Sequence, residues 1–595
     1  MGAIMKATES RIKAWKWAAV AVVAALLVLS PAVAPTPAPP EPTAFIVQAA
    51  SAELAAAAVE SVGGEVTHRL EIIAAVGARL AAGQLAQLRT RGGVRIYADR
   101  TARAAETTDD LTEGGVTGSH GEMIQIEKKG LDTEYPAFID ADELHKAGID
   151  GTGMTIAVID TGVLTQERQI EQGVAENGHG EERILAQYNA IADVETSGSI
   201  LAQLQQAPAI AADQSGHGTH VSSVAVSSYR AKLKGDDRPY NGIAPNADLV
   251  VVKSFDANGA GSYLDVIRGI DWVVANKERY GIRVLNLSFS ATPISYYWDD
   301  PLNQAVMRAW QLGIAVVASA GNRGPDPMTI GVPGNVPYVI TVGAMSDAAS
   351  TDATDDFLAS FSSTGPTFEG FVKPEVLAPG GHLLGLMSET SMIAREHPEY
   401  YHGASYFTMS GTSQAAAVVS GVAALMLQAD PGLTPDDLKC RLLASARPAV
   451  EDDPLTGEHK LAYSVFQQGA GLVNALDAAN DWSAGCANNG LDIDRDLSGE
   501  EHYGGRANRD ESGAYYLSGL EGDGFTWSDG LLWSDGHEFH RGYVWNDGLV
   551  WSDGMTWSDG MTWSDGLLWS DGMVWSDGIT WSDANMAINN WVEQE

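Results

Sequence analysis

The sequence predicts an α/β fold of three layers, in which helices flank both faces of a mostly parallel β-sheet. Residues 137–480 contain five apolar runs rich in β-branched residues, which read as strands without a polar face. Helical patterns such as YLDVIRGIDWVVANKE and DPLNQAVMRAWQL alternate with them. Such alternation indicates a parallel sheet covered on both sides. The five runs are MTIAVID, ADLVVVKSF, IRVLNLSFS, IAVVASAG and YVITVGAM.

A smaller unit precedes this region at residues 44–100. Its segments read as strand, helix, strand, strand, helix and strand, and both helices end at glycine. This β-α-β-β-α-β order is that of a ferredoxin-like α+β domain. The segments are FIVQA, ELAAAAVESVGG, EVTHRLEIIAAVGARL (two strands), AAGQLAQLRTRGG and VRIYADR.

The charge balance narrows the classes of function. The 595-residue chain has 37 Lys and Arg against 77 Asp and Glu, a formal net charge of -40. An acidic surface of this kind repels nucleic acids and anionic membranes, so we expect no nucleic-acid partner. It suits a soluble protein outside the cytosol.

The first 34 residues read as a signal peptide, followed by a Pro-rich spacer at residues 35–43. Basic residues precede an apolar run at residues 17–29, which is too short to span a bilayer comfortably. Residues 32–34 (Ala-Val-Ala) fit a cleavage site, although Pro35 directly after them is unfavourable for signal peptidase. We therefore expect a secreted or cell-surface protein, with an uncleaved anchor as the alternative.

Polar segments follow each of the two units. Residues 101–136 are rich in Gly, Thr and acids and read as an exposed linker, and residues 481–524 read as a second, acidic linker. Asp492, Asp494 and Asp496 have a calcium-like spacing, but the glycine and the closing acid of an EF-hand loop are missing. We therefore assign no metal site to them.

Residues 525–583 repeat with a period of six around the motif WSDG, and residues 584–595 form a C-terminal tail. Asp-Gly is a signal for two-residue hairpin turns. Such turns would leave four-residue strands, with each Trp opposite the second residue of the next strand. A solenoid of hexads is the rival geometry. A disordered acidic tail, a module that binds a cell-surface ligand and a calcium-loaded tail are the open interpretations.

Three polar residues stand where predicted strands or helices meet loops. Asp160 ends the strand MTIAVID, His217 begins a helix in SGHGTHVSS, and Ser413 begins another in SGTSQAAA. A serine nucleophile needs a base, imidazole has a suitable pKa, and a carboxylate orients the imidazole. Asn322 in ASAGNRG and the backbone N–H of Ser413 are candidate donors to an oxyanion. The structural alternatives are an N-cap serine, a buried carboxylate and a helix-start histidine.

These segments resemble four motifs of the subtilisin-like serine peptidases. AVIDTGV resembles the family's Asp motif, HGTHV its His motif, AGN its Asn motif, and GTS before small residues its Ser motif. GIAPNADL, VLNLSFS, FSSTGP and KPEVLAPG resemble the connecting segments. The resemblance implies a subtilisin-like fold over residues 137–480, a catalytic triad of Asp160, His217 and Ser413, and Asn322 in the oxyanion hole.

The sequence departs from the family pattern near the nucleophile. Ala417 stands where the family usually has proline, and Gln414 where it often has methionine. Neither change removes a catalytic group. His220, which lies in the same HGTHV motif as His217, is expected to be structural.

The resemblance also implies a substrate cleft with two walls and an edge strand that pairs with an extended substrate. Serine in place of the family's glycine is expected to narrow the pocket and to favour medium apolar side chains. The first wall is Ser288, Phe289 and Ser290, the opposite wall is Ser319, Ala320 and Gly321, and the edge strand is Gly261, Ser262 and Tyr263.

Residues 44–100 resemble the inhibitory propeptide of the same family. The propeptide would then be an intramolecular partner, and its last strand would lead residues 101–106 into the cleft. Self-cleavage in the linker would release it. Cys440 and Cys486 are the two cysteines of the chain and suggest one disulfide in an exported protein, with two free buried thiols as the alternative.

The sequence as a whole predicts a secreted serine endopeptidase made as an autoinhibited precursor. Its partners would be protein or peptide substrates. No cofactor is required, and calcium remains open because the family often binds it. The alternative is a surface adhesion protein that uses the Trp repeat, with the peptidase fold as a scaffold. A narrow processing protease is consistent with the same triad.

Overall fold

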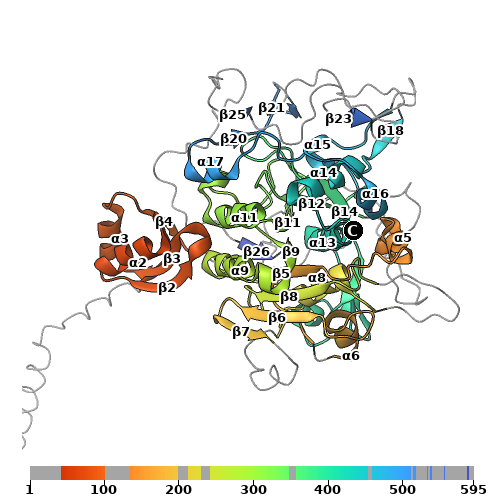
Figure 1. Cartoon of the computed structure of the whole chain (residues 1–595), viewed down its shortest axis with the longest axis horizontal. Helices are drawn as coiled ribbons and strands as arrows, with labels where there is room; N and C mark the ends of the chain where they lie inside the picture. The colour runs from red at the N-terminus through yellow and green to blue at the C-terminus, as the bar shows by residue number, and fades with distance from the viewer. Residues whose placement is uncertain are drawn as a thin grey trace, which may run out of the picture.

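The computed structural model of the chain describes residues 42–100, 134–165, 167–197, 212–229, 241–346, 357–452, 459–510 and 513–517, with short strands at 532–533, 537–538, 555–556 and 586–588. The predicted signal peptide, nearly all of the linker at 101–136 and most of the WSDG repeat lie outside these residues. Figure 1 shows a small N-terminal unit, in red, beside a larger α/β body.

The N-terminal unit has the predicted order of strands and helices. Its four-stranded sheet runs β2-β3-β1-β4, and its strand pairings are antiparallel, as in a ferredoxin-like domain. Ser51 caps the first helix by accepting a hydrogen bond from Leu54 N. The elements are β1 (Thr43–Gln48), α2 (Ala52–Ser61), β2 (Glu65–Leu70), η1 (Glu71–Ile73), β3 (Ala75–Leu80), α3 (Ala82–Arg89) and β4 (Arg95–Ala98).

The larger body is built on a central sheet that contains all five predicted apolar strands. Within the described residues this sheet runs β13-β12-β11-β9-β5-β8-β6-β7, with β14 also paired to β12. The inner pairings are parallel, and β13 and β7 at the two edges are antiparallel. The five strands are β5 (Thr155–Asp160), β8 (Asp248–Lys253), β9 (Ile282–Leu287), β11 (Ala315–Ser319) and β12 (Ile340–Ser346).

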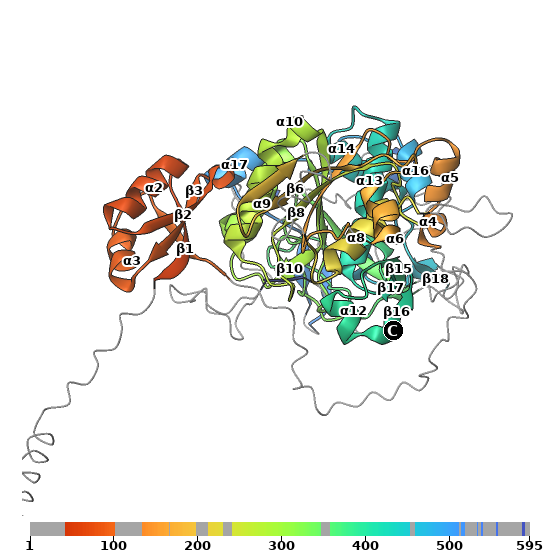
Figure 2. The same cartoon turned by 90° about the horizontal axis from the view of Figure 1, so that it is seen from below.

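Helices cover both faces of this sheet, as the apolar strands require. Figure 2 shows α9 (Tyr263–Ala275) on one side of β6 and β8, and α8 (His217–Val226) and α13 (Thr412–Ala429) on the other. Helix α11 (Pro301–Gln311) packs beside α9. Among the described residues, α13 is the one helix long and apolar enough to cross a membrane, and 89% of its window is buried in the protein core.

Several short strands were not predicted from the sequence. Most have two to four residues or carry polar residues on both faces, so their pattern is weaker than that of the five apolar runs. They are β6 (Ile184–Asn189), β7 (Val194–Ser197), β13 (Phe357–Leu358), β14 (Val376–Pro379), β15 (Leu383–Leu386), β16 (Tyr401–Gly403), β17 (Tyr406–Met409), β18 (Val450–Asp452) and β19 (His459–Leu461). Strand β10 (Phe289–Ala291) begins within the predicted run IRVLNLSFS, which is interrupted at Ser288.

Short helices complete the body and lead into the C-terminal extension. Helix α14 carries Cys440, which forms a disulfide with Cys486 across 5.3 Å between their Cα atoms. The elements are α4 (Tyr135–Phe138), α5 (Ala141–Lys146), α6 (Arg168–Ile170), η2 (Glu171–Ala175), α10 (Lys277–Tyr280), η3 (Tyr297–Asp299), α12 (Met392–Glu396), η4 (Pro398–Tyr400), α14 (Pro435–Ser445), α15 (Val465–Gln468), α16 (Ala475–Asn480) and α17 (Ile493–Ser498).

The three spaced carboxylates at α17 have separate partners. Asp492 caps the helix, and Asp494 pairs with Arg308 at 2.9 Å. Asp496 points inward and accepts hydrogen bonds from the hydroxyls of Tyr297 and Tyr338, at 2.6 and 3.1 Å. Their spacing therefore serves a helix cap and packing of the extension.

The described hairpin of the repeat corrects the predicted turn. Trp533 pairs with His537, the first residue of the next hexad, so the loop has three residues and not two. Three-residue loops that end in glycine are also common in hairpins. The described strands of the extension are β20 (Tyr503–Gly504), β21 (Ala507–Arg509), β22 (Tyr515–Leu517), β23 (Leu532–Trp533), β24 (His537–Glu538), β25 (Met555–Thr556) and β26 (Met586–Ile588).

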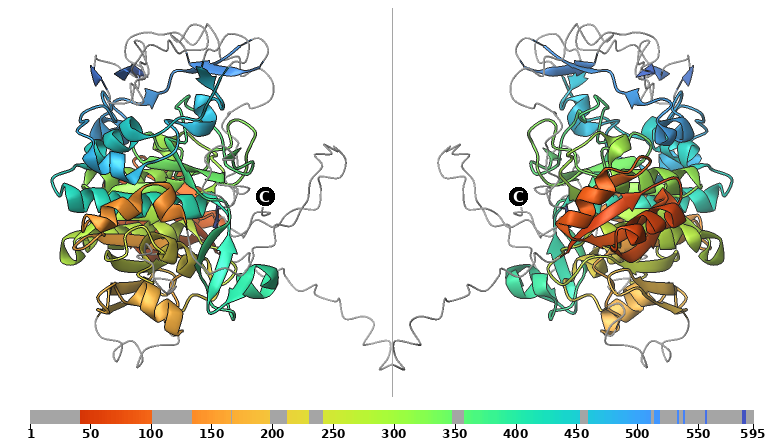
Figure 3. Two further views of the ribbon diagram at one scale, coloured as in Figure 1. Left: turned by 90° about the vertical axis from the view of Figure 1, so that its right-hand side faces the viewer. Right: turned by 90° about the vertical axis from the view of Figure 1, so that its left-hand side faces the viewer.

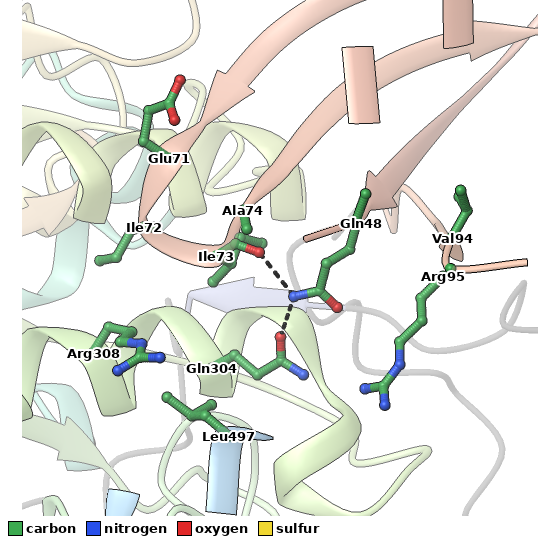
Figure 4. Close-up of a pocket in the computed structure, with 12 residues that line it drawn as sticks. Gln48, Glu71, Ile72, Ile73, Ala74, Val94, Arg95, Gln304, Arg308 and Leu497 are labelled. Carbon is green, nitrogen blue, oxygen red and sulfur yellow. Dashed lines mark hydrogen bonds between the residues drawn. The ribbon is translucent and has the colours of Figure 1, made fainter. Parts of the chain in front are cut away.

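The N-terminal unit docks on α9 and α11, and the right-hand view of Figure 3 shows it in front of the body. Backbone N–H groups of Glu71 and Ile72 donate to the Asp271 carboxylate at 2.9 and 3.1 Å. Gln48 donates to the side-chain oxygen of Gln304 at 2.8 Å, and both side chains line a pocket of about 610 Å³ (Figure 4). Polar pairing on both sides of the contact therefore fixes the orientation of the unit.

Candidate active site

A buried carboxylate–imidazole pair lies at the carboxyl end of the central sheet. Asp160 ends β5, and His217 is the first residue of α8. His217 Nδ1 lies 2.8 Å from Asp160 Oδ1 and 2.9 Å from Oδ2. Because a carboxylate accepts, Nδ1 carries the proton and Nε2 has the lone pair of a base. Among the described residues, Nε2 is buried and has no hydrogen-bond partner.

The loop before His217 sets the position of the imidazole. Asp213 accepts hydrogen bonds from Gly216 N and Thr219 N, both at 2.8 Å, and from the Thr161 hydroxyl at 2.8 Å. One carboxylate therefore joins the start of α8 to the end of β5. Asp213 was not predicted from the sequence, although an acid four residues before a helix-start histidine is a usable signal for a helix N-terminus.

Close backbone contact explains a glycine in this helix. A Cβ atom on Gly218 would lie 2.2 Å from the carbonyl oxygen of Gly162 and 3.0 Å from Asp160 Oδ1. Only glycine lets α8 approach the loop after β5 closely enough for the imidazole to reach Asp160.

Lys253, at the end of the neighbouring strand β8, binds the loops that follow β5 and precede α8. Its ammonium group donates to the carbonyl oxygens of Thr161 and Ala212 and to Gln214 Oε1. Burial lowers the pKa of Lys253, while nearby carboxylates oppose that shift. The sequence analysis missed this residue too, because a lysine at the end of an apolar strand reads as solvated.

Ser413 is the second residue of α13 and is fully buried. Its hydroxyl donates to the carbonyl oxygen of Ser288 at 3.0 Å, and the Ser288 hydroxyl donates back to Ser413 O at 2.9 Å. The hydroxyl therefore points at the wall of the cleft and not at His217. Rotation about the single Cα–Cβ bond would redirect it.

The starts of α8 and α13 lie side by side. Gln414 directly follows Ser413, and His220 lies one helical turn after His217. The Nε2 atom of Gln414 is 3.4 Å from Nδ1 of His220. His220 Nε2 donates to Phe407 O at 3.1 Å, and burial lowers the pKa of His220 to about 4. His220 is thus a neutral histidine between two core elements, consistent with the structural role expected for it.

Asn322 presents an amide nitrogen to the site. Its Oδ1 accepts from Thr412 N at 3.0 Å and from the Thr412 hydroxyl at 2.8 Å. Because a backbone N–H can only donate, the amide oxygen is fixed on that side, and Nδ2 faces the opposite way. Among the described residues, Nδ2 is buried and has no partner. Thr412, which the sequence analysis did not single out, orients the amide.

Two donors border one small space beside Gly411. A Cβ atom built there would lie 3.3 Å from Asn322 Nδ2 and 3.7 Å from Ser413 N. The Ser413 N–H belongs to the first turn of α13, where backbone N–H groups lack intrahelical acceptors. Gln414 Oε1, an acceptor, lies 2.7 Å from the same point. Asn322 Nδ2 and Ser413 N are thus the two donors near this point that can hydrogen-bond to a negatively charged oxygen.

The two predicted cleft walls adjoin each other. The Ser319 hydroxyl donates to Phe289 O at 3.1 Å, which ties the end of β11 to β10. The Ser290 Oγ would lie 3.1 Å from a Cβ on Gly321. The Ser290 side chain therefore occupies space that glycine would leave open. Ala320 is buried in the same turn and accepts from Gly331 N at 3.0 Å.

The predicted edge strand is shorter than expected and ends at a helix start. Ser262 has an extended backbone, forms a β-bridge and caps α9 by accepting from Asp265 N at 3.1 Å. Tyr263 is the first residue of that helix and is therefore not part of a strand. The N–H of Tyr263 nevertheless donates to the carbonyl oxygen of Arg100 at 3.2 Å.

No cluster of three or more His, Cys, Asp or Glu side chains suited to a metal ion occurs within the described residues. The question of calcium therefore receives no support from the geometry of this part of the chain.

Comparison with known proteins places these residues in a known context. The model of the Subtilase family matches residues 151–471, which include the Asp160, His217, Asn322 and Ser413 positions. The chain is 34% identical over 380 residues to serine protease AprX of Bacillus subtilis (strain 168), which covers 62% of this chain and 77% of AprX. It is 28% identical over 344 residues to subtilisin DY of Bacillus licheniformis, covering 57% and 96% of the two chains.

A solved structure has the same fold. Fervidolysin from Fervidobacterium pennivorans, described as a keratinolytic enzyme related to subtilisin, superposes with a TM-score of 0.51 at 23% identity. The match covers 74% of this chain and 62% of that enzyme. The predicted mostly parallel sheet flanked by helices is thereby confirmed as a subtilisin-like fold.

Proposed function

The chain belongs to the subtilase family and is a subtilisin-like serine protease, and from this premise we propose that it is an exported endopeptidase with Asp160, His217 and Ser413 as its triad. One observation carries the proposal. His217 Nε2 and Asn322 Nδ2, which are buried and without partners among the described residues, are the base and the oxyanion donor that acyl transfer needs.

The reaction follows from the roles of these atoms. Ser413 Oγ attacks the substrate carbonyl while His217 Nε2 accepts its proton, and Asp160 stabilises the imidazolium through Nδ1–H. Asn322 Nδ2 and Ser413 N hydrogen-bond to the oxyanion. His217 then gives the proton to the leaving amine, which leaves an acyl group on Ser413. In the second half of the reaction, water attacks this acyl group while His217 takes a proton from the water and gives it to Ser413 Oγ.

A serine-directed fluorophosphonate tests this proposal directly. The processed enzyme should hydrolyse casein, lose that activity on labelling, and carry the label on Ser413 in a peptide map. Ser413→Ala protein should take up no label. Casein hydrolysis that persists after complete labelling would show that another group is the nucleophile.

Removal of the Asn322 amide should slow chemistry without weakening substrate binding. Because Nδ2 would meet the oxyanion only in the transition state, Asn322→Leu should lower kcat by about 10²–10³-fold and leave KM within about twofold. Steady-state kinetics on a tetrapeptide anilide measures both constants. Thr412→Ser, which retains the hydroxyl that orients the amide, is the control. A Leu variant with unchanged kcat would remove Asn322 from the oxyanion hole.

We further propose that the cleft prefers medium apolar side chains, because Ser290 fills space beside Gly321. Ser290→Gly should widen this wall and raise the kcat/KM ratio of Phe over Leu substrates about tenfold, since one buried carbon is worth about that much discrimination. Ser295→Gly, in the loop after β10, controls for the added backbone freedom. An unchanged ratio would place Ser290 outside the specificity pocket.

We propose that the N-terminal unit is the enzyme's own inhibitor. Arg100, the last described residue of this unit, is 3% exposed and inserts between α9 and α11. Its guanidinium donates to the Tyr263 hydroxyl at 2.6 Å and to Thr292 O at 2.8 Å, and lies 3.3 Å from Asp300 Oδ2. The chain that follows Arg100 thus starts at the mouth of the cleft. Residues 101–106 themselves lie outside the described residues.

Self-processing tests this proposal. Wild-type precursor should be cut within residues 101–136, and Ser413→Ala precursor purified free of other proteases should remain intact. Mass spectrometry of both products locates the cut. Complete processing of the Ala variant would mean that release depends on another protease.

Docking of the N-terminal unit should weaken as pH rises. Burial raises the pKa of Asp99 to about 7, and that of Asp271 to about 6. Both carboxylates bridge the interface, where Asp99 accepts from Leu264 N at 3.1 Å. Because these pKa values are raised above about 4, the value for a free carboxyl, docking is strongest below pH 4. Affinity should fall as pH rises through 6 and 7.

Gel filtration of the nicked but associated precursor at pH 5 and pH 8 measures this effect. We expect at least tenfold more dissociation at pH 8. The double variant Asp99→Asn with Asp271→Asn should lose the difference, and Glu60→Gln, on the exposed end of α2, should retain it. Equal dissociation of wild type at both pH values would contradict the assignment.

Export is proposed from the N-terminal sequence pattern, and surface binding by the WSDG repeat is a separate proposal that lies mostly outside the described residues. An adhesion protein with a catalytically idle scaffold is not favoured, because the base, its orienting carboxylate and the oxyanion donor are all retained. A loss of surface retention on deletion of residues 525–583, with casein hydrolysis unchanged, would separate the two activities.

A further inference from the structure

The C-terminal tail supplies a strand to the wall of the cleft. Strand β26 pairs antiparallel with β10, with Ile588 opposite Phe289, residue 587 opposite Ser290 and residue 586 opposite Ala291. In Figure 1, β26 lies against the middle of the α/β body, well separated from β20–β25 at the top. About 30 residues separate β25 from β26, and an extended chain of that length reaches about 100 Å.

Strand β10 contains Phe289 and Ser290 of the predicted cleft wall, and an extended substrate in the cleft would lie along it. It follows directly after Ser288, whose carbonyl oxygen accepts the hydrogen bond of the Ser413 hydroxyl. Its far side is already tied to the body, because Ala291 and Val332 exchange two backbone hydrogen bonds at 2.8 and 2.9 Å. One edge of β10 is thus left for an added strand, and β26 uses it.

The direction of β26 is that of a substrate. Its residue numbers rise from the Ala291 end of β10 towards the Phe289 end, and Ser288 is the next residue along β10. Strand β26 therefore runs along β10 towards the end at which the carbonyl oxygen of Ser288 accepts from the Ser413 hydroxyl.

We propose that the C-terminal tail is an intramolecular pseudo-substrate, which competes with external peptides for β10 in the processed enzyme. This inference rests on the proposed function, since it needs β10 as the substrate wall. Only one strand fits the edge, so the tail and residues 101–106 exclude each other there. After release of the N-terminal unit, the C-terminal tail would then still inhibit the cleft, but more weakly.

Two substitutions of residue 587, one of which removes its backbone N–H, test the proposal in the full-length processed enzyme. Proline lacks the N–H that a β-ladder uses, so Ala587→Pro should release the tail. We expect KM for a tetrapeptide anilide to fall at least threefold, with kcat unchanged. Ala587→Val, which favours extended backbone, should keep the wild-type KM. Truncation after residue 583 should match the proline variant.

Two readouts separate the possible failures. If the enzymatic assignment fails, neither turnover nor fluorophosphonate labelling appears in any variant. If only the pseudo-substrate fails, all variants turn over with one common KM while intact mass shows the tail present. Loss of the segment after β26 in wild type, with retention in Ser413→Ala, supports the proposal, because a strand bound like a substrate is open to cleavage by Ser413.

Discussion

Replacement of Ser413 by alanine is expected to lower kcat by about 10⁶-fold, the scale found when the nucleophile of such a triad is removed. The side chain is fully buried at the start of a long core helix, so loss of one oxygen leaves the backbone and the oxyanion donors in place. The remaining rate comes from those donors and from binding. Active-site-titrated kinetics on a peptide anilide measures the loss.

The Ala variant also provides its own control for folding. Alanine retains the helix start, and the side-chain hydrogen bond that it loses within the described part of the chain is the one to Ser288 O. Its thermal unfolding should lie within a few degrees of wild type, and a non-cleavable peptide should bind as before. A residual kcat above about 1% in a preparation free of contaminating protease would refute the nucleophile assignment.

Replacement of Asp160 by asparagine is expected to lower kcat about 10⁴-fold through the wrong tautomer of His217. Asp160 Oδ1 accepts from Thr161 N at 2.7 Å, so the asparagine oxygen would take that side. Its NH₂ group would then take the place of Oδ2, which lies 2.9 Å from His217 Nδ1, and a hydrogen bond from that group requires Nδ1 to accept. The proton would move to Nε2, and the imidazole could no longer take the serine proton.

The position of the ionisable proton can be read independently of rate. Nitrogen NMR of labelled histidine should show Nδ1–H for His217 in wild type and Nε2–H in Asp160→Asn. Asp142→Asn, a surface carboxylate paired with Lys146, is the matched control and should change neither tautomer nor kcat. A rate loss below tenfold, or an unchanged tautomer, would leave Asp160 with a packing role.

The fold could be predicted because its strands are apolar on both faces. The runs around Val158, Val251 and Leu285 are continuous, and a continuous run of this kind fits only the middle of a covered parallel sheet. Short strands such as β14 and β17 could not be found in this way. They pair through tertiary contacts, and four residues give too little periodicity for assignment.

The catalytic residues were easier to predict than the residues that position their side chains. Asp160 and His217 belong to motifs whose chemistry is visible in the residue types. Asp213 and Thr412 act through hydrogen bonds to backbone N–H groups and to an amide oxygen, and such contacts exist only once the chain is folded. The helix start at Tyr263 was missed because Ser262 is an ordinary residue in a strand edge and an ordinary N-cap.

In the WSDG repeat, the loop length could not be predicted from the sequence. Asp-Gly predicts a turn but does not decide between two- and three-residue loops, and a shift of one residue moves every following side chain to the other face. At the described hairpin, the longer loop is used.

The disulfide between Cys440 and Cys486 affects what happens when one molecule of the protease is cut by another. Any single cut between residues 441 and 485 leaves both fragments covalently joined. The piece that follows the cut carries the extension and β26, while the piece before it carries Ser413. A nicked molecule would therefore migrate as one species without reductant and as two with it, and it would remain assembled in an oxidising medium.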